Sequence, residues 1–367
     1  MRSVAAFTDT YLPTVNGVTY TVEAWRDCWA DRGGRMDVVY PRTDGYAART
    51  GEYPVRSLPF PFYPGFRLGV PWIPRRVRDV DVVHAHTPFA VGLAGLRLAR
   101  RHDRPFVASY HTPSAEYADY LAPSEAVERL VERASERYER WFLDRADAVV
   151  APSGATADHL TDEVGVSTPV TVIPNGIDTE RFRRVDPAAF LSRHGLDDAG
   201  TLLGYTGRHG YEKRLTDLVD AAATLDATVV FGGDGPARAD LEARAADRGV
   251  DARFLGFLDR DELPAFYSAL DAFVFPSPIE TQGLVALEAN ACGTPVVGAN
   301  DGALADTVIE GETGYHFETG DVEGLRESIR RTLSDRERLE ESCLARRDRH
   351  GIDRAVDRLA DVYERVS

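Results

Sequence analysis

The sequence predicts an α/β protein with two domains, each assembled from parallel βαβ units. Short apolar runs alternate with helical stretches along most of the chain, and this alternation is typical of parallel sheets. A chain of 367 residues is also long for one hydrophobic core. The stretch VIPNGIDTERF (172–182) combines proline, glycine and aspartate, as a domain crossing does. We therefore expect one domain at 1–174 and a second at 175–349.

The first domain is expected to begin with a strand at 2–7, a loop through Asn16 and Gly17, and a helix to about Arg32. Glycine at a strand-to-helix turn lets the backbone approach a ligand closely, but an ordinary tight turn explains Gly17 equally well. The next elements are predicted in this order: strands at 36–40 and 80–85, a helix at 89–102 and a strand at 105–110.

Residues 124–145 are predicted to form a long helix, capped at its start by Ser124. Its apolar residues recur at helical spacing and are expected to face the core: Leu130, Ala134, Tyr138, Trp141 and Phe142. The charges of both signs between them are expected to form a solvated face rather than a binding patch.

The segment 57–76, SLPFPFYPGFRLGVPWIPRR, interrupts the alternation of strands and helices. Its five prolines exclude a regular helix or a central strand. Exposed aromatic residues with flanking arginines are able to enter a lipid interface, so this segment is a candidate membrane contact. The alternative, which the sequence favours, is that the segment packs against its own domain.

The second domain is expected to start near Gly200 with the strand TLLGYTG. Its remaining elements are predicted as follows: helices at 213–225, 236–249 and 261–269, and strands at 227–232 and 252–254. The C-terminal region 321–366 is expected to be mainly helical.

Residues 271–298 are predicted to form a strand, a loop, a helix from near Gly283 to Gly293, and another strand. Glu280 lies in the loop. Glu288 follows it by about two helical turns, within the otherwise uncharged stretch LVALEANAC, and a buried carboxylate needs a partner. Two acids near one helix N-terminus indicate a shared ligand site. The spacing fits equally well a solvated Glu280 and a core Glu288 that pairs with an arginine.

The composition is acidic, with 59 acids against 43 bases and a net charge of −16. A nucleic-acid partner is therefore not expected, because phosphate binding needs a basic face. All the bases are arginine except Lys213. Such acid-rich, lysine-poor compositions resemble those of halophilic cytoplasmic proteins, although a GC-rich genome also favours arginine.

Cysteine usage and apolar runs bear on the compartment. The three cysteines form no close pair, which fits a reducing cytoplasm. The first apolar run, VAAF, is too short for a signal peptide, and no run reaches the length of a membrane span. We expect a cytoplasmic protein whose contact with the inner face of the cell membrane, if it has one, is peripheral.

Three histidines lie at predicted strand ends, where open α/β sheets bind ligands: His84, His86 and His111. A zinc site is the less favoured interpretation, because no cysteine accompanies them. His84 is expected to be a packed histidine rather than a ligand.

Five ordered stretches resemble retaining glycosyltransferases of family four. The first is PIETQGLVALEANACGTPVV (278–297), which is similar to their Glu-x7-Glu signature. The others agree in order along the chain: TDTYLPTVNGV (8–18), VIPNGIDTERF (172–182), GRHGYEKRLTDLVDA (207–221) and FGGDGPARADLE (231–242). Two stretches, TDTYLPTVNGV (8–18) and SYHTPSAEY (109–117), are most similar to the branch that makes glycolipids and mannosides. This branch includes sulfoquinovosyl-, diacylglycerol glucosyl- and mannosyltransferases.

The resemblance implies a GT-B fold: two Rossmann-like, doubly wound domains that face each other across a cleft. The N-terminal domain would bind the acceptor and the C-terminal domain the nucleotide sugar, with a last helix at 350–367 packing back on the N-terminal domain. It implies transfer of a hexosyl group from a UDP- or GDP-sugar to a lipid or glycan acceptor, with retention of configuration. The nucleotide sugar is a co-substrate, and no cofactor or metal is implied.

The resemblance also assigns roles to single residues. Arg208 and Lys213 would clamp the leaving diphosphate, a role that suits a planar guanidinium and a compact ammonium. Glu280 and His111 would contact the donor sugar, and Glu288 the ribose hydroxyls. Further donor contacts are implied for Gly17 and for the amides of Thr281, Gln282 and Gly283; acceptor contacts are implied for Asn16 and Tyr117.

One stretch departs from the family pattern, and two other functions stay open. Many relatives carry a Gly-Gly pair and then a Glu, where this chain has Asp301, Gly302 and Asp306. The nucleotide base and the sugar pocket are therefore less defined than the reaction class. A nucleotide-sugar epimerase of similar shape is one alternative, and a transferase to a soluble sugar acceptor is another.

Overall fold

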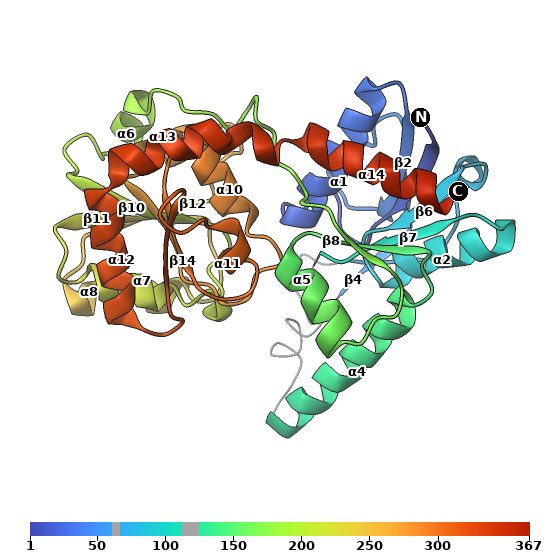
Figure 1. Ribbon diagram of the computed structural model, residues 1–367, viewed down its shortest axis with the longest axis horizontal. Helices are drawn as coiled ribbons and strands as arrows, with labels where there is room; N and C mark the ends of the chain where they lie inside the picture. The colour runs from blue at the N-terminus through green and yellow to red at the C-terminus, as the bar shows by residue number, and fades with distance from the viewer. Residues whose placement is uncertain (61–66, 112–124) are drawn as a thin grey trace. The chain divides into compact units, whose positions relative to one another are not determined.

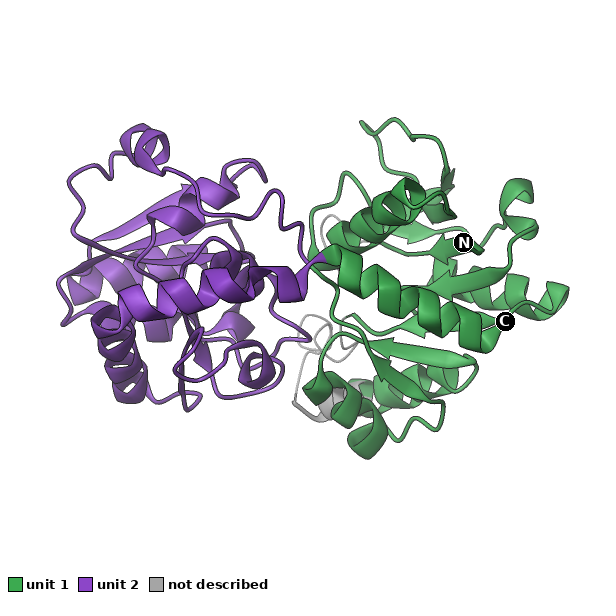
Figure 2. Ribbon diagram, turned by 45° about the horizontal axis from the view of Figure 1, so that its top comes forward, with its two compact units in different colours: residues 1–176, 352–367 green, residues 177–351 purple. Residues whose placement is uncertain are grey.

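The structure is a computed structural model that describes residues 1–60, 67–111 and 125–367. The chain divides into two compact units (Figures 1 and 2). Unit 1 comprises residues 1–176 and 352–367, and unit 2 comprises residues 177–351. Which substrate each unit binds stays a prediction.

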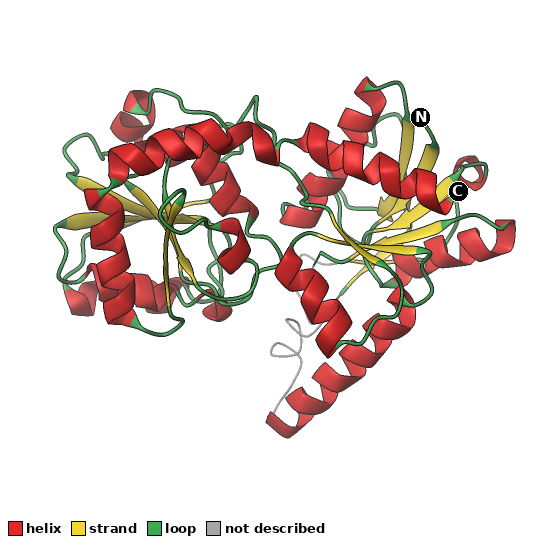
Figure 3. Cartoon of the chain, in the orientation of Figure 1, coloured by secondary structure: helices red, strands yellow, loops and turns green. Residues whose placement is uncertain are grey.

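Unit 1 is organised around a parallel sheet with helices on both faces (Figure 3). Its strands, in spatial order, are β3 (Glu52–Val55), β2 (Arg35–Pro41), β1 (Ser3–Phe7), β6 (Val82–Ala85), β7 (Phe106–Ser109), β8 (Ala148–Ala151) and β9 (Val170–Val172). The apolar run DAVVAPS (147–153) predicts β8, whereas the two edge strands, β3 and β9, are additional to the predicted ones. Both are short and carry polar residues or proline, so hydrophobic periodicity does not reveal them.

Two hydrophobic clusters cover the two faces of this sheet. One contains residues of α1 (Gly17–Asp31) and α14 (Ile352–Val366), including the buried Trp25 and Tyr363. The other contains residues of α2 (Ala90–His102) and the end of α4 (Glu125–Leu143), including Phe142. Unit 1 also contains a short helix α5 (Gly154–Asp158), a π-helical turn (His159–Glu163) and a 3-10 turn (Arg75–Arg78).

The helix predicted at 124–145 is α4, but its core assignment needs correction. Ala134 is exposed, and Trp141 is 41% exposed, whereas Phe142 is buried. Adjacent residues of a helix point about 100° apart, so Trp141 and Phe142 cannot both face the sheet. Leu130 and Ser124 lie outside the residues whose side chains the structure describes.

The proline-rich segment 57–76 contains a small antiparallel pair, β4 (Ser57–Pro59) and β5 (Arg67–Gly69), separate from the main sheet. This agrees with the exclusion of a helix or central strand. Four of its described apolar side chains are exposed: Leu58, Leu68, Val70 and Trp72. Ile73 of the same segment packs against the core of unit 1, so the segment has both exposed and packed apolar residues. Phe62 lies outside the described residues.

Unit 2 has a second parallel sheet. Its strands, in spatial order, are β12 (Ala252–Gly256), β11 (Ala227–Gly232), β10 (Thr201–Thr206), β13 (Ala272–Phe275), β14 (Val296–Ala299) and β15 (Gly314–Phe317). Its helices are α6 (Ala188–His194), α7 (Leu215–Ala222), α8 (Arg238–Arg248), α9 (Leu263–Ala269), α10 (Leu284–Ala291), α11 (Leu304–Thr307), α12 (Val322–Ser334) and α13 (Arg336–Arg346). Two 3-10 turns, Tyr211–Lys213 and Arg347–His350, complete the described elements of unit 2.

The last helix, α14, belongs to unit 1 and packs on α1. Arg32 at the end of α1 forms ion pairs with Asp353 and Asp357 of α14. Trp29 and Tyr363 meet edge to face, with ring centroids 5.3 Å apart. Across the described residues, no helix is both long and apolar enough to cross a bilayer.

Candidate active site

Lys213 and Glu280 form the central ion pair of unit 2. The Lys213 Nζ atom lies 2.8 Å from Glu280 Oε1 and 3.3 Å from the carbonyl oxygen of Ile279. Lys213 ends the 3-10 turn after β10, and Glu280 lies in the loop after β13. Because β10 and β13 are neighbouring parallel strands, both loops leave the same edge of the sheet. Glu280 is thus a paired carboxylate and not the solvated loop residue of the alternative interpretation.

Arg208 lies in the same loop as Lys213 and also faces a carboxylate. Its Nη2 atom donates to Glu212 Oε1 at 2.6 Å. Glu212 was not predicted as a site residue, although it directly precedes Lys213, the only lysine of the sequence. Both predicted diphosphate-binding cations are therefore held by a neighbouring carboxylate in this structure.

Glycines allow two loops at this sheet edge to touch. A Cβ atom on Gly233 would lie 2.0 Å from the carbonyl oxygen of Gly207, and one on Gly235 would lie 2.5 Å from that of His209. The amide of His209 donates to the carbonyl of Asp234 at 2.9 Å. The glycine-rich stretch FGGDG therefore fixes the loop that carries Arg208.

Glu288 is buried in α10 and accepts a hydrogen bond of 2.8 Å from the hydroxyl of Tyr267 in α9. Burial raises the pKa of Glu288 to about 7, against the opposing effects of the Tyr267 hydroxyl and of the charges of Arg260 and Arg181. Glu288 is thus a buried acid with a tyrosine partner, and the charges of the nearby Arg260 and Arg181 also act on it. The sequence did not predict that Tyr267 belongs to the site, because an aromatic residue on a helix is usually part of the core.

The spacing of the two acids also needs correction. Since α10 starts at Leu284, Glu280 is outside the helix and Glu288 lies little more than one turn inside it. Gly283 precedes the helix with φ of 74°, and a Cβ atom there would lie 2.7 Å from Leu304. The neighbouring Thr281 and Gln282 belong to the same loop, and the Gln282 carbonyl accepts from the Thr307 hydroxyl at 2.6 Å.

Three buried histidines of unit 1 lie close together in its core: His84, His86 and His111. His86 Nδ1 and His111 Nε2 are 3.1 Å apart, and their rings stack at 5.4 Å. Burial lowers the pKa of His111 to about 4 and that of His86 well below its usual value, where the neighbouring histidines lower it further. Both imidazoles are therefore neutral near pH 7. The hydrogen bond between His86 and His111 was not predicted from the sequence.

His84 is buried, and both of its ring nitrogens contact hydroxyl groups of the core. Its two ring nitrogens lie 2.7 Å from the Tyr363 hydroxyl and 2.8 Å from the Ser109 hydroxyl. Its predicted place as a packed histidine agrees with these contacts. Within residues 1–60, 67–111 and 125–367, no group of three or more His, Cys, Asp or Glu side chains is arranged to hold a metal ion.

The loop before α1 is held by Asn16. Its side-chain oxygen accepts from the amide of Thr19 at 2.9 Å, and its nitrogen donates to the Thr10 hydroxyl at 2.8 Å. Asn16 is thus the N-cap of α1, and Gly17 is the first residue of that helix. Tyr117 lies outside the described residues.

Comparison with known proteins identifies the class. The model of Glycosyltransferase Family 4 matches residues 15–181, and that of Glycosyl transferases group 1 matches residues 189–345. The chain therefore belongs to glycosyltransferase family four, and its two parallel sheets form the GT-B fold. It is a hexosyltransferase that uses a nucleotide sugar as donor.

Three relatives illustrate the range of the family. Sulfoquinovosyl transferase SQD2 of Arabidopsis thaliana is 33% identical over 305 residues, which are 78% of this chain and 57% of that protein. Alpha-monoglucosyldiacylglycerol synthase of Streptococcus pneumoniae is 30% identical, with 80% of this chain and 70% of the relative covered. A GDP-mannose-dependent alpha-(1-6)-phosphatidylinositol dimannoside mannosyltransferase of Mycobacterium tuberculosis is 29% identical, with 92% and 89% covered. Two of these names specify a transferase and one a synthase, and none of the three specifies an epimerase.

Solved structures support the fold. Sucrose-phosphate synthase from Thermosynechococcus elongatus gives a TM-score of 0.80 at 22% identity, with 99% of each chain covered. The Anabaena protein HepE, solved in complex with UDP, gives a TM-score of 0.76 at 18% identity, also with 99% of each chain covered. At these identities the likeness concerns the fold.

Proposed function

We propose that this enzyme transfers a hexosyl group to a lipid or glycan acceptor with retention of the anomeric configuration. The observation that carries the proposal is the Lys213–Glu280 pair, at the edge of the sheet where α/β proteins bind ligands. It joins a cation suited to a leaving phosphate with a carboxylate suited to sugar hydroxyls.

Lys213 and Arg208 act on the leaving diphosphate in this proposal. The diphosphate gains negative charge as the glycosidic bond breaks, and a cation aimed at its oxygens lowers the barrier. Glu280 and Glu212 hold these two cations by hydrogen bonds at the edge of the sheet. Since both charges come from side chains, we propose that no divalent cation is required and that a chelator leaves the rate unchanged.

Glu280 and Glu288 bind hydroxyl groups of the donor. Each carboxylate can accept two hydrogen bonds, which suits hexose hydroxyls for Glu280 and ribose hydroxyls for Glu288. The Tyr267 hydroxyl orients Glu288 for this role. We further propose that the amides of residues 281–283 contact the donor, that His111 contacts the donor sugar, and that the loop of Asn16 and Gly17 lies against the substrates.

A lipid is the acceptor that we favour. The three relatives named above include two whose names specify glycerolipid or phosphatidylinositol products, and their acceptors motivate this choice. The exposed apolar residues of the 57–76 segment, among them Trp72 at 57% exposure, are suited to a lipid interface. We propose that this segment brings the enzyme to the membrane surface.

Two measurements test the proposed function. A thermal-shift panel of UDP- and GDP-sugars identifies the donor, because a ligand that binds only the folded state raises the melting temperature. Product analysis by NMR with that donor and diacylglycerol or phosphatidylinositol acceptors then gives the linkage. An α-linked lipid product from an α-linked donor is expected; an inverted linkage, or transfer to soluble sugars alone, contradicts the proposal.

The membrane segment is tested by liposome flotation in high salt. Trp72→Ser should reduce both flotation and lipid glycosylation. Unchanged values for this variant would remove the segment from the proposal and leave the transferase activity standing.

A further inference from the structure

Unit 1 carries a surface pocket of about 470 Å³ beside the C-terminal half of α2 and the end of α4. The two helices touch here, since a Cβ atom on Gly92 of α2 would lie 3.6 Å from the ring of Phe142. The pocket is lined by Leu93, Leu96, Arg97, Arg100, Arg101, Trp141 and Arg145.

Four arginines line this pocket, and none of them forms an ion pair with a carboxylate of the described residues. The chain has a net charge of −16, and most of its other described arginines form ion pairs with nearby acids. Among the described residues, no Asp or Glu lines the pocket or forms an ion pair with Arg97, Arg100, Arg101 or Arg145. The pocket is therefore a local concentration of positive charge on an acidic protein.

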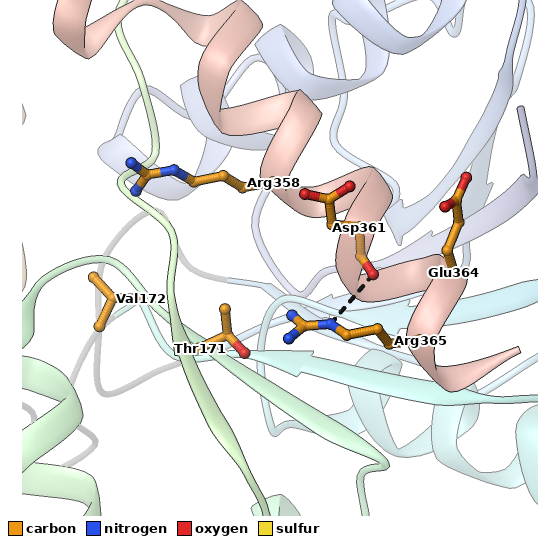
Figure 4. A pocket seen from close by; sticks show the side chains of 6 residues that line it. All are labelled: Thr171, Val172, Arg358, Asp361, Glu364 and Arg365. Carbon is orange, nitrogen blue, oxygen red and sulfur yellow. Dashed lines mark hydrogen bonds between the residues drawn. The ribbon is translucent and has the colours of Figure 1, made fainter.

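A second pocket of unit 1 has a different balance of charge. It measures about 590 Å³ and lies between α14 and Thr171 and Val172 (Figure 4). Two arginines and two acids of α14 line it together: Arg358, Asp361, Glu364 and Arg365. Its charges sum to zero, so it has no preference for an anion.

Trp141 and Leu93 give the α2 pocket an apolar component. The Arg145 guanidinium lies 4.0 Å from the centre of the Trp141 ring and donates to the Trp141 carbonyl at 2.6 Å. This contact places the Arg145 guanidinium over the indole ring, where it forms a cation–π interaction. Arginine forks match phosphate oxygens in geometry and charge.

Stabilisation of the helix end explains part of this cluster but not all of it. Arginines in the last turn of α2 interact favourably with the helix dipole, which accounts for Arg100 and Arg101. Arg145 lies on the segment after α4 and Trp141 on α4 itself, so the dipole of α2 requires neither residue. An exposed tryptophan beside arginines that form no ion pair with a described carboxylate points instead to a ligand that is anionic and partly apolar.

We propose that this pocket binds a phosphate group that is attached to an apolar or aromatic moiety. The phosphate contacts Arg97, Arg101 and Arg145, and the attached moiety lies on Leu93 and Trp141. Such a ligand has two sources, the headgroup of an anionic phospholipid and a free phosphorylated metabolite. The pocket does not depend on the proposed acceptor, because its binding is measured without donor or turnover.

The test uses the full chain and one matched pair of variants. Arg97→Gln with Arg101→Gln removes two charges from the α2 pocket, and Arg358→Gln with Arg365→Gln removes two from the α14 pocket. Flotation with phosphatidylglycerol vesicles, with phosphatidylcholine vesicles as reference, probes the lipid source. Tryptophan fluorescence titrated with inorganic pyrophosphate probes the soluble source. Circular dichroism melts check folding, and the single variant Arg145→Gln serves if the double variant does not fold.

Loss of binding in the α2-pocket variant alone supports the proposal. Flotation on anionic vesicles that weakens more than about tenfold in that variant, and not in the α14-pocket variant, identifies a lipid headgroup. Pyrophosphate binding with the same pattern and without flotation identifies a free phosphate. Equal binding of both probes by all variants, or none by the wild type at 0.15 M salt, overturns the proposal. Lipid glycosylation that survives such a result would leave the proposed function intact.

Discussion

The two units hold their candidate ligand-binding groups in different electrical states. In unit 2 the groups are ions held in pairs, Lys213 with Glu280 and Arg208 with Glu212. In unit 1 they are neutral imidazoles, with His86 bonded to His111 and both pKa values lowered by burial. The cations of the ion pairs can interact with a diphosphate. Neutral imidazoles instead fix the direction of a hydrogen bond without attracting a counter-ion. The comparison predicts that variants in unit 2 change charge stabilisation and that variants in unit 1 change orientation.

The largest expected effect belongs to Lys213. Lys213→Ala should lower kcat by about a hundred- to a thousandfold with little change in donor affinity, because the diphosphate gains charge mainly in the transition state. Lys213→Arg should recover only part of the rate, since the planar guanidinium is bulkier than the ammonium. Steady-state kinetics with a saturating acceptor measures both variants. Arg244→Ala, which breaks a surface pair with Asp220, is the control. A kcat near the wild-type value in Lys213→Ala would remove this residue from the catalytic set.

The partnership of Lys213 with Glu280 illustrates what the sequence could and could not predict. The motifs around both residues were recognisable, and the family resemblance assigned both residues to the donor. That the two side chains bond to each other depends on the order of the strands in the sheet, which no local pattern contains. The sequence therefore identified Lys213 and Glu280 as site residues but did not predict that they pair with each other.

Other gaps have the same physical origin. Tyr267 reaches Glu288 from another helix, and Tyr363 reaches His84 from the last helix of the chain. Trp141 was assigned to the core because its spacing from other apolar residues fits a buried stripe, yet only Phe142 faces the sheet. Periodicity identifies an amphipathic helix, but it does not decide which of two adjacent aromatic residues is buried.

Glu288 should give the next largest effect, visible as pH dependence. Its folded-state pKa of about 7 lies above the ordinary value of 4.5. The resulting stabilisation is complete below about pH 4.5 and is lost as the pH rises through 7; it amounts to about 3 kcal/mol. Donor binding has the opposite sign, because ribose hydroxyls favour the ionised carboxylate. Donor affinity should therefore rise about tenfold from pH 6 to pH 8.

Glu288→Gln separates these two effects. The amide cannot ionise, so both the unfolding free energy and the donor affinity should lose this pH dependence, while the affinity itself falls. Urea titrations and isothermal calorimetry at pH 6, 7 and 8 measure the two quantities. A wild-type donor affinity that is flat across this range would show that Glu288 is already ionised before the donor binds.

His86 should have a moderate effect that reports on orientation. His86→Phe keeps a ring of similar size but removes the hydrogen bond to His111, so kcat should fall about three- to tenfold with the melting temperature nearly unchanged. If His86 acts only through His111, the double variant with His111→Phe should be no slower than His111→Phe alone. Additive losses in this cycle would contradict a positioning role. The ¹⁵N shifts of the His111 ring give an independent measure of its tautomer.

Tyr363→Phe should have the smallest effect on kcat, and it tests whether His84 shares the orienting role of His86 and His111. The hydroxyl of Tyr363 contacts His84, not His86, and its removal leaves one buried nitrogen of His84 without that partner while the Ser109 contact remains. The free energy of unfolding should fall by about 1–2 kcal/mol, and kcat should stay at the wild-type value. Thermal melts and steady-state kinetics on the same preparation measure both. Since the rings of His84 and His86 lie only 4.1 Å apart, a loss of activity in Tyr363→Phe would mean that the histidines act as one unit. An unchanged rate would confine the orienting role to His86 and His111 and leave His84 as part of the core on which α14 packs.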